Sequence, residues 1–305
     1  MKSLFVIILM LAVPALAGDQ PRTEEIINTI LDAGPEEKTA DQIKGAAALE
    51  KAPDAPEAVS PPSPGDVKAA PAIVVPPRPR ESRETEESAP RVTGEEQLLL
   101  KTGIDFYNNG LYDHSLRKFQ DLSAKFPSGM YRDSARFWMG KIYMKQYRYD
   151  DAIREFAAVS AESGDYPAAI FYSGESSQMK GDRIASIEYY QKVQAQFPSH
   201  ELADKALLNA GMLYLEQRKG TQALDSAVRI IKYYKDRATV DDAYYLMGKI
   251  YEKDPQLKDV EIARRIYRQF LTKGESDDRF GSSPLKKRVE EDLLRIEKTY
   301  FRLEK

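Results

Sequence analysis

The sequence predicts an all-α protein: a right-handed α-solenoid of about five helical hairpins plus a C-terminal capping helix, preceded by a disordered, proline-rich arm. Three observations support this prediction. Five glycines follow one another at intervals of 37, 34, 37 and 37 residues: Gly103, Gly140, Gly174, Gly211 and Gly248. Each of these glycines is followed by a second amphipathic segment with helical periodicity. Proline, which interrupts helices, is frequent up to Pro90 and sparse from Leu98 onward.

Composition excludes several classes of function. The formal net charge of -3 gives no basic field of the kind that binds nucleic acid. The chain contains no cysteine, which rules out disulfides, thiolate nucleophiles and thiolate metal ligands. With only two histidines, His114 and His200, a histidine metal site or general base is hard to build. We therefore expect no cofactor, no metal and no catalytic site.

Residues 1–17 have the features of a signal peptide. Lys2 precedes an apolar run over residues 4–13, and Ala15 and Ala17 are the small residues expected before a cleavage site. The alternative is a membrane anchor, but a spanning helix needs about 20 apolar residues. We expect cleavage after Ala17, a periplasmic protein and no transmembrane segment in the mature chain.

Residues 18–50 are expected to form a tail, and residues 51–94 a disordered, proline-rich linker. Within the tail, residues 24–31 place Ile27, Ile30 and Leu31 on one helical face. A helix this short is marginal alone. It is either a weakly structured tail or a docking helix that folds onto a partner or onto a groove of this chain.

The repeats span residues 95–274. An aromatic residue follows most of the glycines three positions later, as in Phe106 and Tyr143, and a small residue such as Ala152 or Ala223 recurs in the second helix. We interpret the glycine as the point where the two helices of a hairpin approach closely, with that aromatic filling the gap beside it. One such hairpin cannot bury its apolar face alone, so several must stack.

This pattern resembles the tetratricopeptide repeat. In the first copy the small, aromatic, small, aromatic and proline positions are Gly103, Phe106, Ser115, Phe119 and Pro127. Other copies contribute Gly140, Tyr143, Ala152 and Phe156; Gly174, Ser186, Tyr190 and Pro198; Gly211, Tyr214 and Ala223; and Gly248, Tyr251, Ala263 and Tyr267 after a short insertion. The departures are Ser115 and Ser186 for alanine, Ser177 for an aromatic and Ala227 for the second-helix aromatic. The resemblance implies a fold and leaves the function open.

A narrower resemblance lies in residues 134–143. The run around Phe137, Trp138 and Gly140 is similar to a segment of periplasmic repeat proteins linked to the Tol-Pal envelope system, the cell division coordinator type. Those proteins carry an N-terminal coiled coil that this sequence lacks. Outer-membrane assembly lipoproteins with five such repeats are also similar, but they carry a lipidated cysteine. Both likenesses imply a role in the cell envelope.

Residues 283–305 are expected to form the capping helix. Ser283 suits the N-cap position and Pro284 the first turn. One apolar stripe consists of Leu285, Val289, Leu293, Ile296, Tyr300 and Leu303. The stripe either covers the last repeat or forms a dimer face. Paired acidic residues, namely Glu86-Glu87, Asp241-Asp242, Asp277-Asp278 and Glu290-Glu291, are interpreted as solvated surface.

The candidate partner-binding groove lies on the first helix of each repeat. Residues three before and one after each glycine lie four apart and so share a face. A third row, four residues after the glycine, adds Tyr107, Met144, Gln178 and Leu215 from the next turn. The groove residues are Leu100, Ile104, Tyr107, Phe137, Lys141, Met144, Phe171, Glu175, Leu208, Met212, Leu215, Tyr245 and Lys249. Such a row fits an amphipathic helix or an extended apolar peptide. Two alternatives remain: the row is core between repeats, or residues 26–31 occupy it as an internal ligand.

These features predict a non-catalytic periplasmic scaffold that binds an envelope protein or peptide, with a role in envelope biogenesis or division. One alternative is a structural subunit of a larger envelope or motility assembly. Another is an accessory to a cell-wall enzyme. The partner, the oligomeric state and any contact with peptidoglycan stay open.

Overall fold

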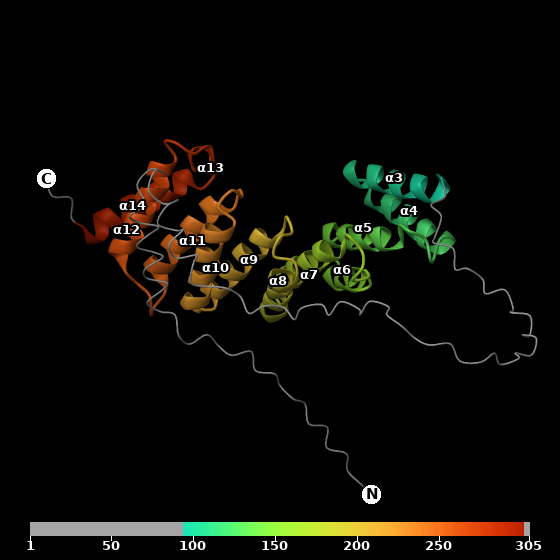
Figure 1. The fold of residues 1–305 in the computed structure, drawn as a ribbon, viewed down its shortest axis with the longest axis horizontal. Helices are drawn as coiled ribbons and strands as arrows, with labels where there is room; N and C mark the ends of the chain where they lie inside the picture. Colours follow the sequence, from blue (N-terminus) through green and yellow to red (C-terminus); the bar gives the residue numbers. More distant parts are fainter. Residues whose placement is uncertain (1–93, 302–305) are drawn as a thin grey trace, which may run out of the picture.

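The computed structural model describes residues 94–301, which form twelve α-helices with no strand among them (Figure 1). The first ten helices pair into five hairpins: α3 (Gly94–Asn108) with α4 (Tyr112–Lys125), α5 (Arg132–Lys145) with α6 (Tyr149–Ala157), α7 (Tyr166–Lys180) with α8 (Arg183–Gln196), α9 (Ala203–Glu216) with α10 (Gly220–Tyr233), and α11 (Val240–Lys253) with α12 (Val260–Lys273). The chain then forms α13 (Asp278–Gly281) and α14 (Lys286–Tyr300). The predicted right-handed α-solenoid is confirmed.

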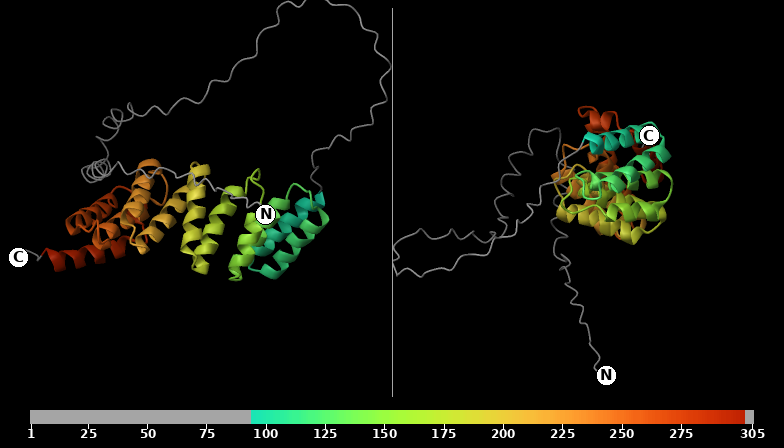
Figure 2. Two further views of the ribbon diagram at one scale, coloured as in Figure 1. Left: turned by 90° about the horizontal axis from the view of Figure 1, so that it is seen from below. Right: turned by 90° about the vertical axis from the view of Figure 1, so that its right-hand side faces the viewer.

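The hairpins follow one another along a curved row. Each second helix packs against the first helix of the next hairpin, and the first helices α3 and α5, α5 and α7, and α9 and α11 also contact one another. In Figure 1 the two ends of the row, at α3 and α13, lie on the same side of α8. Figure 2 shows the same row from below, with neighbouring helices side by side. The first helices therefore form the inner side of the curve, which we call the concave face.

Within a hairpin, the glycine of the first helix lies under a ring from the second. A Cβ added at Gly103 would stand 2.5 Å from Phe119, and one added at Gly174 would stand 2.8 Å from Tyr190. Gly140 and Gly248 are covered in the same way by Phe156 and Tyr267. The gap at the glycine is therefore filled by the second-helix aromatic, and the expectation that the residue three positions after the glycine fills it is corrected.

Two departures from the repeat pattern are satisfied by hydrogen bonds. The Ser115 hydroxyl donates to the Gly103 carbonyl at 2.7 Å, and the Ser186 hydroxyl donates to the Gly174 carbonyl at 2.9 Å. Both serines are fully buried, so each bond satisfies a polar group that would otherwise be costly to bury. Serine can therefore replace alanine at the helix crossing without loosening the hairpin.

A third departure is compensated from the next repeat. Ala227 stands where the other second helices carry an aromatic ring. The space over Gly211 is filled instead by Leu246 of α11, 2.8 Å from the position of an added Cβ. The core there joins the last two hairpins and α14 in one continuous cluster, whereas the earlier hairpins share smaller ones.

The predicted capping helix is α14. Val289 and Ile296 are fully buried, and Leu285 and Leu293 pack against the same core. Tyr300 is half exposed. Helix α14 packs against α12, the position that a sixth first helix would take.

Several predictions fall outside the described residues. They are the signal peptide 1–17, the tail 18–50, nearly all of the linker 51–94, and Leu303 in the apolar stripe. Gly94, placed at the end of the linker, is instead the first residue of α3.

Candidate functional site

All thirteen predicted groove residues lie on the first helices, but they differ in accessibility. Phe137, Phe171 and Leu208 are 9%, 3% and 8% exposed. The Phe137 ring packs 5.9 Å from that of Phe156, centroid to centroid. For these three residues the burial supports the alternative interpretation, core between repeats, and the expectation that they line an open groove is corrected. Leu100, in the same row, is half-buried.

The second row, formed by the residue directly after each glycine, is partly open to solvent from α3 to α9. Ile104, Lys141 and Glu175 are half-buried, and Met212 is 39% exposed. The Lys141 ammonium lies 3.7 Å from the centre of the Tyr172 ring. This row keeps its side chains on the concave face.

Glu175 occupies an unusual environment at the centre of this face. Burial raises the pKa of its carboxyl group, and the positive charges of Lys141, Lys205 and Lys145 oppose that rise. Within residues 94–301, no hydrogen bond or ion pair reaches the Glu175 carboxylate. A half-buried carboxylate with lysines nearby, but none bonded to it, is free to accept hydrogen bonds from another molecule.

The third row consists of the residues four positions after the glycine, and its residue type varies with the ring that covers the glycine. Where that ring is a tyrosine, the residue four after the glycine accepts a hydrogen bond from its hydroxyl: Tyr190 donates to Gln178 Oε1 at 3.0 Å, and Tyr267 to Glu252 Oε2 at 3.0 Å. Where the ring is a phenylalanine, the same position holds Tyr107 or Met144. Leu215 follows Gly211, where no ring is present. Tyr107, Met144 and Leu215 are half-buried, so they serve hairpin packing and also border the concave face.

A short polar chain crosses the concave face beside Glu175. The Asn209 amide donates to the Tyr190 hydroxyl at 3.1 Å, and that hydroxyl donates to Gln178. Burial raises the pKa of Tyr190 to about 12, so the hydroxyl stays protonated and keeps this direction. Within the described part of the chain, the Gln178 amide NH₂ and the Asn209 carbonyl oxygen form no bond. They are a donor and an acceptor of the kind that peptide backbone groups pair with.

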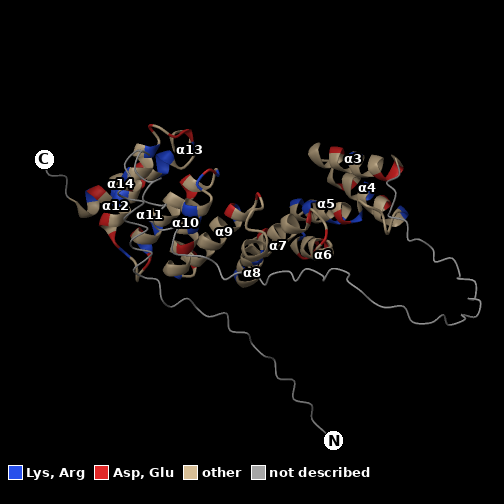
Figure 3. Ribbon diagram, in the orientation of Figure 1, with Lys and Arg blue, Asp and Glu red and all other residues tan. Residues whose placement is uncertain are grey.

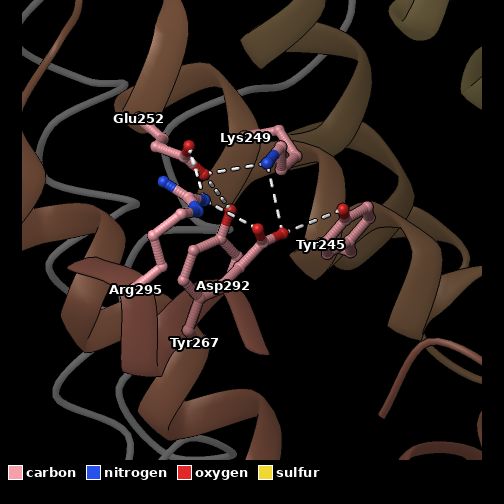
Figure 4. A network of polar contacts seen from close by, with 6 residues as sticks. All are labelled: Tyr245, Lys249, Glu252, Tyr267, Asp292 and Arg295. Carbon is pink, nitrogen blue, oxygen red and sulfur yellow. Dashed lines mark hydrogen bonds and ion pairs between the residues drawn. The ribbon is translucent and has the colours of Figure 1, made fainter. Parts of the chain in front are cut away.

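The C-terminal end of the concave face is closed by α14. Figure 4 shows Tyr245 and Lys249 of α11 turned toward Asp292 of α14, with both donating to Asp292 Oδ2 at 3.1 Å. Arg295 donates to Glu252 at 2.8 Å and to Asp292 at 2.6 Å. These bonds engage Tyr245 and Lys249 within the protein, so their placement in an open groove is corrected.

This network keeps its charged groups paired. Lys249 also lies 2.9 Å from Glu252, and the side chains of Lys249, Glu252 and Asp292 are 12%, 8% and 14% exposed. Burial alone would raise the pKa of Asp292, but hydrogen bonds from Arg295 and Lys249 lower it below its usual value. Burial raises the pKa of Tyr245 to about 12. Sequence reasoning missed this cluster because the residues of α11 and α14 that bond to each other lie 43 or 47 positions apart.

Outside this face, charges are mixed. Figure 3 shows acidic and basic residues interspersed along the hairpins. The pair Asp241-Asp242 is not solvated as expected: Asp241 is 5% exposed, and burial together with the Asp241 charge raises the pKa of Asp242 to about 6. Glu290 and Glu291 are exposed, as expected. The pair Glu86-Glu87 lies outside the described residues.

The remaining acidic pair and the histidines are structural or exposed. Asp277 accepts the Arg279 backbone N–H at 3.0 Å and so caps α13. His114 is exposed, whereas His200 is half-buried and accepts the Leu202 backbone N–H at 3.2 Å. Residues 94–301 contain no cluster of three or more acidic or histidine side chains arranged to hold a metal ion. No helix in this range is long and apolar enough to cross a membrane.

No family model and no curated protein matches the sequence. Among solved structures, the fold is similar to the MamA protein, with a TM-score of 0.50 and 18% identity over 60% of this chain and 96% of that one. It is also similar to a tetratricopeptide repeat protein from Parabacteroides merdae ATCC 43184, with a TM-score of 0.51 and 12% identity over 68% of this chain and 80% of that one. At these identities the likeness concerns the fold, which is a tetratricopeptide-type α-solenoid.

Proposed function

We propose that the chain is a non-catalytic scaffold that binds a segment of another protein along its concave face. The five hairpins and their cap account for nearly all of residues 94–301, and the curved row offers several helices to one elongated ligand. Side chains from α5, α7 and α9 meet at the middle of the face, where a ligand would touch all three helices.

The observation that carries the proposal is the environment of Glu175. Its carboxylate is half-buried, its pKa is raised by burial, and no described residue bonds to it. Desolvating a charged group without a partner opposes folding. A ligand that donates a hydrogen bond to Glu175 would compensate this cost in the complex, as a backbone N–H of a bound peptide can.

The surroundings of Glu175 define the chemistry of the ligand. Lys141 and Lys205 supply positive charge beside it, and the free amide groups of Gln178 and Asn209 suit peptide backbone. Met144 and Met212 provide adaptable apolar contacts on the helices on either side. We infer a ligand whose backbone N–H groups bond to Glu175 and whose acidic side chain pairs with Lys141 or Lys205, with apolar residues on either side.

The face is open only over part of its length. From α3 to α9 the half-buried groove residues face solvent, whereas at α11 the contacts with Asp292 occupy Tyr245 and Lys249. The ligand would therefore lie across the first four repeats. This length suits a short helix or an extended peptide.

We further propose that the protein acts in the periplasm, in envelope biogenesis or division. The support is in the sequence: the signal-peptide features of residues 1–17, and the resemblance of residues 134–143 to repeat proteins of the Tol-Pal system. An envelope protein or peptide is the proposed partner. Nucleic acid is not the proposed partner, because the formal net charge is -3 and acidic and basic residues are interspersed along the described helices.

A library of 12-residue peptides, displayed and selected on the full chain, tests the binding function. We expect enrichment of peptides that carry an acidic residue between apolar residues. Lys141→Glu with Lys205→Glu should weaken the selected peptides about tenfold or more, since charged contacts in partly desolvated sites are worth roughly 1.5–3 kcal/mol.

The matched control reverses two other lysines, Lys232→Glu with Lys235→Glu. Both are exposed: Lys232 is in the last turn of α10, a second helix outside the concave face, and Lys235 follows the end of that helix. The control should bind like the wild type. Equal loss in both double variants would mean non-specific charge attraction, and no enrichment at all would contradict the proposed function.

A further inference from the structure

The two ends of the solenoid differ in whether a described helix covers them. At the C-terminal end, α14 covers the last hairpin and buries Val289 and Ile296 completely. At the N-terminal end, α3 has no helix before it within residues 94–301. Solenoids need both ends covered, because an end repeat otherwise exposes the apolar face that its neighbours bury.

The uncovered position on α3 can be identified by comparison with the later repeats. The residue five before the repeat glycine is an alanine in the second to fifth repeats: Ala135, Ala169, Ala206 and Ala243. All four are at most 1% exposed, since the preceding hairpin packs on them. In the first repeat the same position is Leu98, a larger apolar side chain that is 62% exposed.

Leu98 borders a shallow, open hollow on the surface of α3. The hollow has a volume of about 520 Å³, and its apolar lining is Leu98, Leu100, Ile104 and Tyr131. Gln97, Lys101 and Asp105 provide its polar edge. This surface joins the side of α3 where a preceding helix would pack to the beginning of the concave face.

The sequence contains one segment suited to cover the apolar surface of α3 around Leu98. Thr23 is a helix N-cap residue, Glu24 and Glu25 suit a first turn, and Gly34-Pro35 is a typical helix end. Between these signals, residues 24–33 place Ile27, Ile30 and Leu31 on one face. The other apolar run before α3, residues 73–75, lies between Pro71 and Pro76, which do not allow a helix of useful length.

The connection is long enough for this contact. Residues 34–93 separate the segment from α3, and a chain of that length spans on the order of 190 Å when extended at about 3.1 Å per residue. A ten-residue helix is marginal alone, so its apolar face needs a surface to pack on. Tethering to α3 supplies such a surface at an effective concentration that a separate molecule does not reach.

We propose that residues 24–33 of the same chain form a helix that packs on α3 over Leu98 and caps the N-terminal end of the solenoid. The contact is intramolecular and apolar, and it is independent of the peptide-binding function proposed above. It makes Leu98 the counterpart of the buried alanines in the later repeats.

Disulfide trapping tests this contact directly, because the chain has no native cysteine to interfere. The test pair is Asn28→Cys with Lys101→Cys, two polar positions adjoining the proposed apolar contact. The control pair is Ala69→Cys with Lys101→Cys, which is closer in sequence and would therefore form faster if the connection were unstructured. Both pairs are oxidised in the full chain at low protein concentration.

We expect the Asn28→Cys pair to form an intramolecular disulfide at least ten times faster than the control pair. Adding Leu98→Glu or Ile30→Glu should lower the rate of disulfide formation in the Asn28→Cys pair to that of the control pair. Leu98 is largely exposed and lies outside the hairpin core, so Leu98→Glu should keep a cooperative thermal transition and lower its midpoint only by the loss of the cap. A retained cooperative transition distinguishes lost docking from unfolding.

Three results would overturn the proposal. A rate equal to or below that of the control means that the segment does not dock on α3. A disulfide that forms between chains means that the occupant is a second copy. Faster trapping of Asn28→Cys with Met212→Cys than with Lys101→Cys means that the segment lies in the middle of the concave face.

Discussion

The ring of Phe156 lies directly over Gly140: a Cβ at residue 140 would stand 2.5 Å from Cε1 of that ring. The contact joins α5 to α6 and is repeated at equivalent places in three other hairpins. The glycine is needed because there is no room for any side chain, and a rigid aromatic ring cannot move aside as a flexible chain can.

Gly140→Ala should therefore lower the free energy of unfolding by about 1–3 kcal/mol, the usual cost of overpacking a core. Urea denaturation followed by circular dichroism measures it. Gly94→Ala is the matched control, because a Cβ there meets nothing within 4 Å. Adding Phe156→Leu to Gly140→Ala should recover part of the loss, and a fully additive double variant would contradict the contact.

The repeat spacing was sufficient to predict the fold. Glycine recurrence located the hairpins, and the apolar stripe of Val289 and Ile296 located the capping helix. The sequence did not reveal what fills the space over Gly211, because Leu246 comes from a different repeat. Such a contact depends on how hairpins stack, which spacing within one repeat does not determine.

The groove was predicted less well than the fold. Helical periodicity grouped residues of the first helices, yet it could not tell how deeply each of them is buried. Phe137 and Phe171 are core because neighbouring first helices pack closely there. Asn209 was missed because it lies between the chosen rows, although it bonds to Tyr190 on the concave face.

Four hairpin turns each contain a residue with a positive φ angle. Gly110 and Gly181 adopt φ angles of 74° and 90°, and the equivalent residues Tyr147 and Arg218 adopt 60° and 58°. Only glycine takes this left-handed conformation without strain. Tyr147→Gly should raise the free energy of unfolding by about 0.5–1 kcal/mol, whereas Tyr147→Ala, which keeps the strain, should not. Equal stability of the two variants would contradict this.

Asp242 should make stability depend on pH. Burial and the neighbouring Asp241 charge raise its pKa to about 6 in the folded state, against an ordinary value near 4. Between these values the folded state binds the proton more tightly than the unfolded state. The free energy of unfolding therefore falls as pH rises from about 4 to 6, and the loss persists at pH 7.

Asp242→Asn removes this effect. Because the group is only partly buried, we expect the variant to be about 1 kcal/mol more stable than the wild type at pH 7 and equal to it near pH 4. Denaturant unfolding at both pH values checks this. Glu290→Gln, on the exposed side of α14, serves as the control and should leave stability at pH 7 unchanged. A destabilised Asp242→Asn at pH 7 would show that the carboxylate has a stabilising partner.

The proposed export predicts the first residue of the mature chain. If residues 1–17 are a cleaved signal peptide, the protein recovered from the periplasm begins at Gly18. Intact-mass analysis of the periplasmic fraction measures this. Replacing Ala15 and Ala17 by bulky residues should block cleavage, and a wild-type mass that includes residues 1–17 would refute the proposed processing.

The most direct test of the scaffold function is the affinity of the selected peptides for Met212→Glu. Met212 lies on the concave face and is 39% exposed, so the substitution should leave the thermal midpoint nearly unchanged. Ile184→Glu is the control, since Ile184 lies on the second helix α8 and is 71% exposed. We predict that Met212→Glu weakens peptide binding at least tenfold while Ile184→Glu binds like the wild type. Unchanged affinity in Met212→Glu would contradict the claim that the concave face is the binding site.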